Sequence, residues 1–446
     1  MKNELELSRY QAMDRQSIWH PYTRFSAINA GPLPIMTRGE GIYLYDAEGR
    51  KYLDAISSWW ACNLGHSHPA VMDAIIAQTR ELQHSILGNL SHPRAIELAS
   101  MIADLFPDDR RVMFASDGSC AVEAALKIAL QYWYNIGQTR KTKFISLDFA
   151  YHGDTLGAVS VGYLEAFHKP FKSALFPVFQ APSPCCGTCA FHAPEQTCVQ
   201  ECIDTMRTLI REHAHEVAAV IIEPMCQGSG GMRIHTASYL KALAETCKHE
   251  GVLLIADEIA VGMGRTGKLF AFEHAGILPD IVCMGKSLSA GYLPISAAVV
   301  RDAIYETFRD QPEDHTFYHG HTFAGNPIAA AAAVATLRVF EAEGVVAHAA
   351  AMGKILAEEL APLATLPGVR NVRSLGLIGV VELADNQDGF GTRRAIQIRD
   401  RLRANGILLR PLGPVIYVMP PLIIPEPSLR YLVQALGKVI RESESQ

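Results

Sequence analysis

Three charged residues follow three separate apolar runs of the sequence. Glu223 follows the run AAVII, Asp257 follows VLLIA, and Lys286 follows IVCMG. Continuous apolar runs of this kind are typical of parallel strands that are buried on both faces. The carboxyl ends of parallel strands meet at one edge of a sheet, where α/β proteins bind ligands, so we expect the three side chains to converge. Any one of them alone would be interpreted as a surface charge at a strand end.

A lysine and an aspartate in one crevice suit the chemistry of pyridoxal 5′-phosphate (PLP). The amine of Lys286 would form an imine with the PLP aldehyde, and it must lose its charge to act as nucleophile and base. Asp257 would pair with the pyridinium nitrogen and keep it protonated, so that the ring can accept electrons from a carbanion. The two residues therefore predict a PLP enzyme whose cofactor is carried on Lys286.

A glycine and a serine at the start of a predicted helix offer a place for the cofactor phosphate. Asp117, Gly118 and Ser119 open a helix that we expect over Cys120–Tyr134. The backbone N–H groups at a helix N-terminus bind anions, glycine permits close approach, and serine adds a hydroxyl donor. A capped turn without a ligand is the alternative for this motif taken by itself.

The glycine-rich segment Gly262–Gly267 imitates a nucleotide-binding loop. It matches the pattern G-x-G-x-x-G, and with Lys268 it nearly completes a P-loop. However, Leu269 occupies the place of the Ser or Thr that binds Mg²⁺, and no long amphipathic helix follows. We therefore expect no nucleotide here, but a flexible loop that places Arg265 near the site.

The middle of the chain alternates short apolar runs with helix-length segments. This alternation predicts βαβ units and a mainly parallel sheet covered by helices, which is an α/β fold. The expected strands are Lys143–Leu147, Val217–Ile222, Val252–Ala256 and Ile281–Met284, and the expected helices include Cys120–Tyr134 and Tyr239–Glu250.

The two ends of the chain have a different pattern from its middle. Two short strands joined by a turn are expected within residues 39–53, and helices alternate with strands after residue 335. Both ends are therefore expected to build one smaller α+β domain. The predicted division is an N-terminal segment of the small domain at 1–65, a large PLP-binding domain at 66–335, and the rest of the small domain at 336–446.

Composition excludes several other classes of protein. The chain has 446 residues with 40 Lys and Arg against 46 Asp and Glu, so it lacks the basic excess expected for nucleic-acid binding. No apolar stretch approaches the length needed to span a bilayer, and the charged N-terminus does not resemble a signal peptide. We expect a cytoplasmic protein.

Five cysteines lie close together in the sequence, at 185, 186, 189, 198 and 202. The C-x-x-C spacing of Cys186 and Cys189 can hold zinc or an iron–sulfur cluster. The surrounding segment is rich in proline, and the later pair has the irregular spacing C-x₃-C. We therefore expect inert thiols and no metal, with a metal site at Cys186 and Cys189 as the alternative.

Three long segments resemble the class III aminotransferases. They are IIEPMCQGSGG at 221–231, LLIADEIAVGMGRTGKLFAFEHAGILPDIVCMGKSLSAGYLPIS at 253–296, and HTFAGNPIAAAAA at 321–333. The resemblance extends over nearly the whole chain. It implies the aspartate aminotransferase-like fold (PLP fold type I) and a homodimer with the active sites between its subunits.

Four further segments resemble the members of this family that act in biotin biosynthesis. The resemblance implies 8-amino-7-oxononanoate as amino acceptor and S-adenosylmethionine as donor, although some such enzymes use lysine. A class III transaminase for ω-amino acids or diamines, or a PLP racemase, is the alternative. The four segments are Trp19–Thr23, Ser57–Trp60, Tyr151–Thr155, and Arg410–Gly413 followed by IYVMPP.

The resemblance also implies roles for individual residues. Tyr151 would stack on the PLP ring beside His152, Glu223 would lie at the cofactor's rim, and Thr322 would reach the phosphate in the neighbouring subunit. Arg410 would hold the acceptor's carboxylate. The residue before Thr322 is His321, where the biotin enzymes have proline. The substrate-binding residues implied by the resemblance are Tyr22, Trp59, Trp60, Arg265, Gly320, Arg410 and Tyr417.

This set of residues makes physical sense for a long aliphatic acid. Aromatic walls bury methylene groups, and a guanidinium binds a carboxylate through two hydrogen bonds. Without the resemblance, Trp59 and Trp60 would be interpreted as a core pair and Arg410 as part of a surface ion pair.

Overall fold

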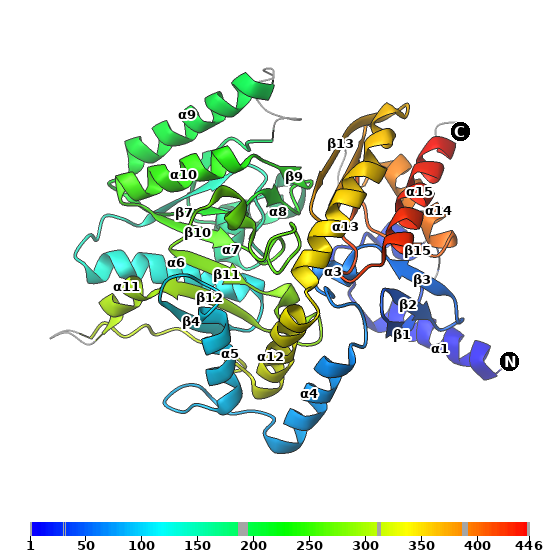
Figure 1. Cartoon of the computed structure of the whole chain (residues 1–446), viewed down its shortest axis with the longest axis horizontal. Helices are drawn as coiled ribbons and strands as arrows, with labels where there is room; N and C mark the ends of the chain where they lie inside the picture. Colours follow the sequence, from blue (N-terminus) through cyan, green and yellow to red (C-terminus); the bar gives the residue numbers. More distant parts are fainter. Residues whose placement is uncertain are drawn as a thin grey trace.

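The chain folds into a large helix-covered sheet and a smaller part in which both chain ends lie (Figure 1). The computed structural model describes residues 2–29, 31, 33–185, 195–309, 314–385 and 391–443.

A seven-stranded sheet forms the centre of the large part. Its order is β4-β12-β11-β10-β7-β5-β6, and the five strands from β11 to β6 are parallel. β12 runs antiparallel to both of its neighbours. The four strands expected from the sequence are confirmed as β5, β7, β10 and β11. The bounds are β4 Arg110–Ala115, β5 Lys143–Leu147, β6 Phe179–Ala181, β7 Val217–Ile222, β10 Leu253–Asp257, β11 Ile281–Met284 and β12 Ser296–Arg301.

Helices cover both faces of this sheet, with α9 and α10 on one side and α6 on the other (Figure 1). α6 begins where the Asp117 side chain accepts a hydrogen bond from the backbone N–H of Cys120. α10 ends at Gly251, whose φ of 62° is the left-handed conformation that commonly closes a helix. The helices of this part are α4 Pro69–Glu81, α5 Pro93–Ala103, α6 Gly118–Asn135, α7 Leu156–Val161, α8 Glu165–His168, α9 Glu195–His213, α10 Ala237–Glu250, α11 Asp302–Tyr305 and α12 Pro327–Ala342.

Short elements connect these units. They are the 3-10 helices η1 Lys169–Ala174, η3 Ala271–Ala275, η4 Lys286–Ser289 and η5 Glu306–Phe308, and the hairpin strands β8 Cys226–Gln227 and β9 Arg233–Ile234.

The smaller part joins the two ends of the chain through a shared sheet. β15 near the C-terminus pairs in parallel with β3 near the N-terminus, next to the expected hairpin of β2 and β3. The division at 65 and 335 stays a prediction, and its second boundary falls inside α12. The elements are α1 Lys2–Ser17, α2 Phe25–Asn29, β1 Met36–Glu40, β2 Tyr43–Asp46, β3 Lys51–Asp54, α3 Ser57–Trp60, α13 Val345–Leu360, η6 Ala361–Thr365, β13 Val369–Leu375, β14 Ile378–Leu383, α14 Arg393–Ala404, β15 Ile407–Leu408, β16 Val415–Val418 and α15 Glu426–Glu442.

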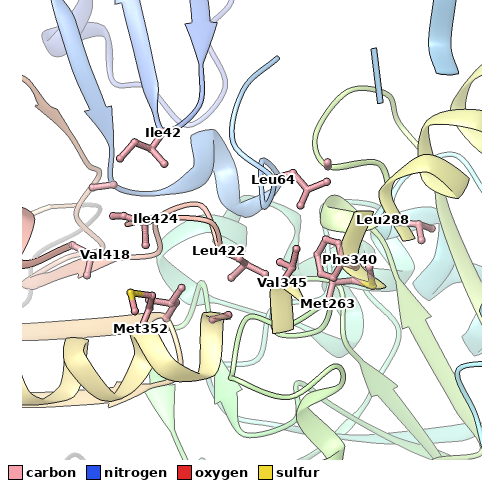
Figure 2. Packing of buried hydrophobic residues seen from close by; sticks show 14 of the residues in the cluster. Ile42, Leu64, Met263, Leu288, Phe340, Val345, Met352, Val418, Leu422 and Ile424 are labelled. Atoms are coloured by element: carbon pink, nitrogen blue, oxygen red, sulfur yellow. The ribbon is translucent and has the colours of Figure 1, made fainter. Parts of the chain in front are cut away.

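One continuous apolar cluster lies at the junction of the two parts. Side chains from the N-terminal sheet, the loop after β10, α12, α13 and the C-terminal strands pack together there, and burial of such surface is the main favourable term in folding. The junction is therefore held by a shared core. The residues labelled in Figure 2 are Ile42, Leu64, Met263, Leu288, Phe340, Val345, Met352, Val418, Leu422 and Ile424.

Among the described residues, none of the helices combines the length and the apolar character that crossing a bilayer would require.

Candidate active site

The three charged residues predicted from the strand ends converge in one cavity. β7, β10 and β11 are neighbours in the sheet, so Glu223, Asp257 and Lys286 lie at the carboxyl ends of adjacent strands. All three line a cavity of about 240 Å³. The other lining residues are Trp60, Asp117, Gly118, Ser119, Tyr151, His152, Gly153, Ile259 and Ala260.

Asp257 is held in one orientation by two hydrogen bonds. Its Oδ2 lies 2.7 Å from Nδ1 of His152, and its Oδ1 accepts from the backbone N–H of Ile259 at 3.1 Å. Both side chains are buried, and Nε2 of His152 has no hydrogen-bond partner among the described residues. The cavity therefore contains a fixed carboxylate and a buried polar atom that a bound group could satisfy.

Lys286 begins the 3-10 helix η4 with a φ of 39°, which side-chain-bearing residues rarely adopt. Its Nζ lies 5.3 Å from the centre of the Trp60 ring. Burial lowers the pKa of the Lys286 amine, against the opposing effect of Asp257 and Glu223. A lysine amine with a lowered pKa is suited to act as nucleophile and base.

The N-terminus of α6 forms a close-fitting cradle at the other end of the cavity. A Cβ atom on Gly118 would lie 3.0 Å from the Ile259 side chain, and one on Gly153 would overlap Ser119. Ser119 Oγ accepts a hydrogen bond from the backbone N–H of Asp154 at 3.3 Å. A helix N-terminus with this narrow approach suits a phosphate. With Lys286 and Asp257 in the same cavity, the residues present fit PLP.

Glu223 borders the cavity as a buried carboxyl group that is 4% exposed. Its oxygens accept hydrogen bonds from the backbone N–H groups of Tyr151 at 3.0 Å and Gly228 at 2.8 Å. Burial raises its pKa to about 7, although these bonds and His152 act in the opposite direction.

A second cavity of about 430 Å³ adjoins the first and shares Trp60, Tyr151 and Lys286 with it. Five residues that the resemblance assigned to the substrate line this cavity. The structure thus brings most of the expected pocket together beside the lysine. These residues are Tyr22, Trp59, Trp60, Arg410 and Tyr417, and Pro21, Asp154, Phe167, Ser229 and Leu412 complete the lining.

Arg410 lies among the aromatic side chains of this second cavity. Its guanidinium carbon is 4.5 Å from the centre of the Trp59 ring and 5.7 Å from that of Tyr22. One guanidinium nitrogen donates to the Tyr22 carbonyl at 3.2 Å. Burial lowers the pKa of Arg410. The group thus presents a positive charge in a partly apolar pocket, where an anion is bound more strongly than in water.

Asp154 is a member of the site to which the sequence analysis assigned no role. It accepts hydrogen bonds from the Tyr22 hydroxyl at 2.5 Å and the Tyr151 hydroxyl at 3.0 Å, and His168 Nε2 lies 3.5 Å away. Burial, and then the bond to Asp154, raise the pKa of Tyr22 to about 12. In the sequence, only its position three residues after Tyr151 could have indicated that Asp154 belongs to the site. Tyr22 and His168 approach Asp154 only in the folded chain.

Arg265 lies elsewhere than the sequence analysis expected. It is 1% exposed and lines neither cavity of the site. Its guanidinium donates to Ser57 Oγ, Asn63 Oδ1 and the carbonyls of Leu377 and Pro420. Arg265 is thus part of the junction between the two parts of the chain. The loop that carries Arg265 is buried over 261–266 instead of being an open, flexible segment.

Two further expected residues lie outside both cavities. Gly320 and Thr322 are exposed on the loop before α12, and neither lines the cavities of the same chain. This position is compatible with the expected reach of Thr322 into a neighbouring subunit.

The metal alternative at Cys186 and Cys189 lies outside the described residues. Cys185 and Cys202 are buried free thiols. In the part of the chain that the structure describes, no group of three or more metal-binding side chains is present.

Comparison with known proteins gives relatives along almost the whole chain. A profile of the family described as aminotransferase class-III matches residues 25–440. Adenosylmethionine-8-amino-7-oxononanoate aminotransferase of Geobacter sulfurreducens is 40% identical over 435 residues, which cover 96% of each chain.

Solved structures are similar over the same extent. The structure of the Methanocaldococcus jannaschii adenosylmethionine-8-amino-7-oxononanoate aminotransferase has a TM-score of 0.92 at 38% identity, covering 98% of this chain and 99% of its own. A PLP-bound amine transaminase from an uncultivated Pseudomonas species has a TM-score of 0.92 at 34% identity, covering 96% and 98%. These matches confirm the expected fold and cofactor. The chain therefore belongs to the class III aminotransferases, which are PLP-dependent transaminases.

Proposed function

We propose that this chain transfers an amino group from S-adenosylmethionine to 8-amino-7-oxononanoate, giving 7,8-diaminononanoate for biotin biosynthesis. The observation that carries the proposal is the second cavity, which is lined by Arg410, by aromatic side chains and by Lys286. An elongated aliphatic acceptor with a terminal carboxylate is complementary to it in shape and charge. The names of the Geobacter and Methanocaldococcus relatives support the same pair of substrates.

The first cavity would hold the cofactor. When bound, PLP supplies an electron sink for the carbon that carries the amino group. Lys286 would bind it covalently, and Asp257, oriented by His152, would keep its ring nitrogen protonated. Gly118 and Ser119 at the N-terminus of α6 would bind the phosphate.

Two more side chains would complete the cofactor site. Tyr151 lines both cavities, which suits a ring that stacks on the cofactor between phosphate and substrate. Glu223 would lie at the cofactor's rim, where its raised pKa of about 7 limits the negative charge near the ring.

Lys286 would also move the proton that the reaction requires. Its Nζ would take a proton from the carbon bearing the donor amine and would deliver one to the carbonyl carbon of the acceptor. Only the neutral amine can act as the base. Because burial lowers its pKa, a larger fraction of Lys286 is neutral near pH 7 than for an exposed lysine.

The second cavity would bind the acceptor along its length. Arg410 would hold the carboxylate with two hydrogen bonds. Trp59, Trp60, Tyr22 and Tyr417 would exclude water from the methylene groups. Together these contacts would present the acceptor's carbonyl to Lys286.

We further propose that the protein works in the cytoplasm as a homodimer. The exposed loop with Thr322 supports the dimer, because the resemblance implies that Thr322 reaches the cofactor phosphate of a neighbouring subunit. The same loop exposes the rings of Tyr318 and Phe323, at 77% and 62%, and such apolar side chains are commonly covered at interfaces.

The amine transaminase among the solved relatives supports a second candidate, a class III transaminase for ω-amino acids or diamines. Arg410 and the aromatic walls favour the long carboxylate-bearing acceptor over a small amine. Short, doubly charged substrates would leave much of these walls uncovered.

The two candidates are separated by a product assay on the PLP-loaded enzyme. It is incubated with 8-amino-7-oxononanoate and, in turn, S-adenosylmethionine, lysine, γ-aminobutyrate or putrescine, and 7,8-diaminononanoate is measured by mass spectrometry. We expect product with S-adenosylmethionine and none from the Lys286→Ala variant. Strong turnover of γ-aminobutyrate or putrescine with pyruvate, and none of the oxononanoate, would support the second candidate instead.

A further inference from the structure

The two tryptophans of the substrate cavity stand on a strained turn. Within α3, the φ angles of Ser57, Ser58 and Trp60 are 49°, 59° and 65°, and Ser58 has a ψ of −77°. The φ and ψ angles of Ser58 are close to those of the classic γ-turn, a conformation that is rare and strained. Such a backbone persists only when its surroundings hold it, and strained backbone clusters at functional sites.

A buried carboxylate just before the turn holds it in place. Asp54, the last residue of β3, is 1% exposed. Its Oδ2 accepts from the Ser58 backbone N–H at 2.6 Å and the Ser58 hydroxyl at 3.2 Å, while Oδ1 accepts from the Ile56 N–H at 3.2 Å. His66 Nε2 lies 2.9 Å from Oδ2 and fixes the carboxylate from the other side. The most strained residue is therefore bound directly to Asp54.

A second set of bonds ties the start of the turn to the core. The Ser57 hydroxyl donates to the Met419 carbonyl at 2.8 Å and accepts from Arg265 at 3.2 Å. Leu64, just after the turn, packs in the apolar cluster at the junction of the two parts (Figure 2). The turn is thus also anchored through Ser57 to residues that do not line the cavity.

The other side of the turn faces the reacting groups. Trp60 donates through Nε1 to the Tyr417 hydroxyl at 3.2 Å, and its carbonyl accepts from Ser287, the residue after Lys286, at 3.4 Å. The Trp59 ring lies 4.5 Å from the Arg410 guanidinium. A shift of the turn would therefore displace both aromatic walls relative to Lys286 and Arg410.

We infer that Asp54 is a positioning residue for the substrate cavity, although it lines neither cavity of the site. By holding Ser58 in its strained conformation, Asp54 sets the places of Trp59 and Trp60 and so the fit of a long aliphatic substrate. The inference rests on the proposed function only for the identity of that substrate.

The variant Asp54→Asn tests this role, because the amide keeps the size but cannot accept all the hydrogen bonds that reach Oδ2. Asp46→Asn is the matched control. Asp46 is also the buried last residue of a strand in the same sheet, and it accepts from the backbone N–H groups of Glu48 and Arg50 and from the Tyr52 hydroxyl.

Steady-state kinetics with the PLP-loaded enzymes give the first readout. We expect Asp54→Asn to raise the KM for 8-amino-7-oxononanoate by about tenfold or more, since a displacement of ~1 Å has large effects. The lost contacts bind the substrate and the transition state about equally, so kcat should change much less than KM. Asp46→Asn lowers Tm to a similar degree but leaves KM unchanged. Equal KM values for the two variants would overturn the inference.

A rescue experiment separates strain from a general loss of structure. Glycine adopts a positive φ without the penalty of a Cβ atom, so Ser58→Gly needs less support from Asp54. We expect Ser58→Gly added to Asp54→Asn to recover most of the lost KM. An unchanged KM in the double variant would contradict the inference.

Two further experiments cover the cases in which the first variant or substrate fails. If Asp54→Asn does not fold, Ser57→Ala is measured in its place. It removes the hydroxyl bonds to Met419 and Arg265, and the KM for the oxononanoate must rise. If the wild type does not use the oxononanoate, the proposed function fails, and the same variants are compared on the amine that bleaches the bound cofactor.

Discussion

Nδ1 of His152 lies 2.7 Å from Oδ2 of Asp257, and both side chains are buried behind the carboxyl edge of the sheet. Together with the backbone N–H of Ile259, this contact holds the carboxyl group of Asp257 in one orientation. We propose that this fixed carboxyl group pairs with the ring nitrogen of bound PLP. The pair thus connects the end of β10 with the segment after β5.

Asp257→Asn should lower kcat by ~10²-fold or more, because it removes a fixed charge that stabilises the charge developing in the transition state. His152→Phe should lower kcat by a smaller factor, because the carboxylate of Asp257 remains but is no longer held in its orientation by the histidine. The pH dependence of the bound cofactor's absorbance reports the ring nitrogen directly. Full activity of Asp257→Asn with an unaltered spectrum would contradict the assignment.

Glu223 makes the stability of the cofactor-free protein depend on pH. Its pKa is about 7 in the folded chain against an ordinary value of 4.5. Between these values the folded chain keeps a proton that the unfolded chain releases, so stability falls as pH rises through this window.

A glutamine side chain is neutral at every pH, so the Glu223→Gln variant should not lose stability as the pH rises through this window. The unfolding free energy of the variant, relative to wild type, should therefore rise by on the order of 3 kcal/mol between pH 4.5 and 7. Urea titrations of the two cofactor-free proteins at several pH values measure it. A difference that does not change with pH would contradict the raised pKa.

Arg410→Met should raise the KM for 8-amino-7-oxononanoate by ~10²-fold, since each hydrogen bond to a charged group contributes about 1.5–3 kcal/mol. Arg410→Lys should not restore binding, because an ammonium group lacks the two-pronged geometry.

The control for Arg410 is Arg399→Met, which removes a guanidinium paired with Asp400 in the same part of the chain. This variant should keep its KM within about twofold, as ion pairs that are partly exposed to solvent contribute little. Equal effects of Arg399→Met and Arg410→Met would show that general electrostatics, not a carboxylate contact, governs binding.

Arg265→Met should destabilise the whole fold. It leaves four oxygens, on Ser57, Asn63, Leu377 and Pro420, without their charged donor. We expect the free energy of unfolding to fall by about 3 kcal/mol or more.

Lys268→Met is the matched control for Arg265, since it removes an exposed cation of the same loop. Its effect should stay within about 0.5 kcal/mol. If Arg265→Met instead kept its Tm and only weakened substrate binding, the role expected from the sequence would be the correct one.

The residues that meet in the first cavity could be predicted from the sequence because their positions depend on local patterns. Buried apolar runs identify strands, and residues directly after them must lie at the ligand-binding edge of a parallel sheet. Glu223, Asp257 and Lys286 followed from this rule alone. The helix N-terminus at Gly118 and Ser119 was likewise visible in the pattern of glycine before a helix.

The residues that the sequence analysis missed or misplaced depend on contacts between distant segments. Arg265 is surrounded by oxygens from Ser57 and Asn63 on one side and from the C-terminal part on the other, and no periodicity reveals such a junction. Asp54 is the last residue of a short strand, as Asp46 is, and only the folded backbone shows that the turn beyond Asp54 is strained.

Above all, we propose that Lys286 carries the cofactor of an enzyme that takes an amino group from S-adenosylmethionine and gives it to 8-amino-7-oxononanoate. Single-turnover absorbance spectroscopy of the PLP-loaded protein tests it most directly, with Lys286→Ala as the control. We expect S-adenosylmethionine to bleach the absorbance of the bound cofactor in the wild type, the oxononanoate to restore it, and the variant to show neither change at a comparable rate. A cofactor absorbance that neither compound perturbs would overturn this proposal.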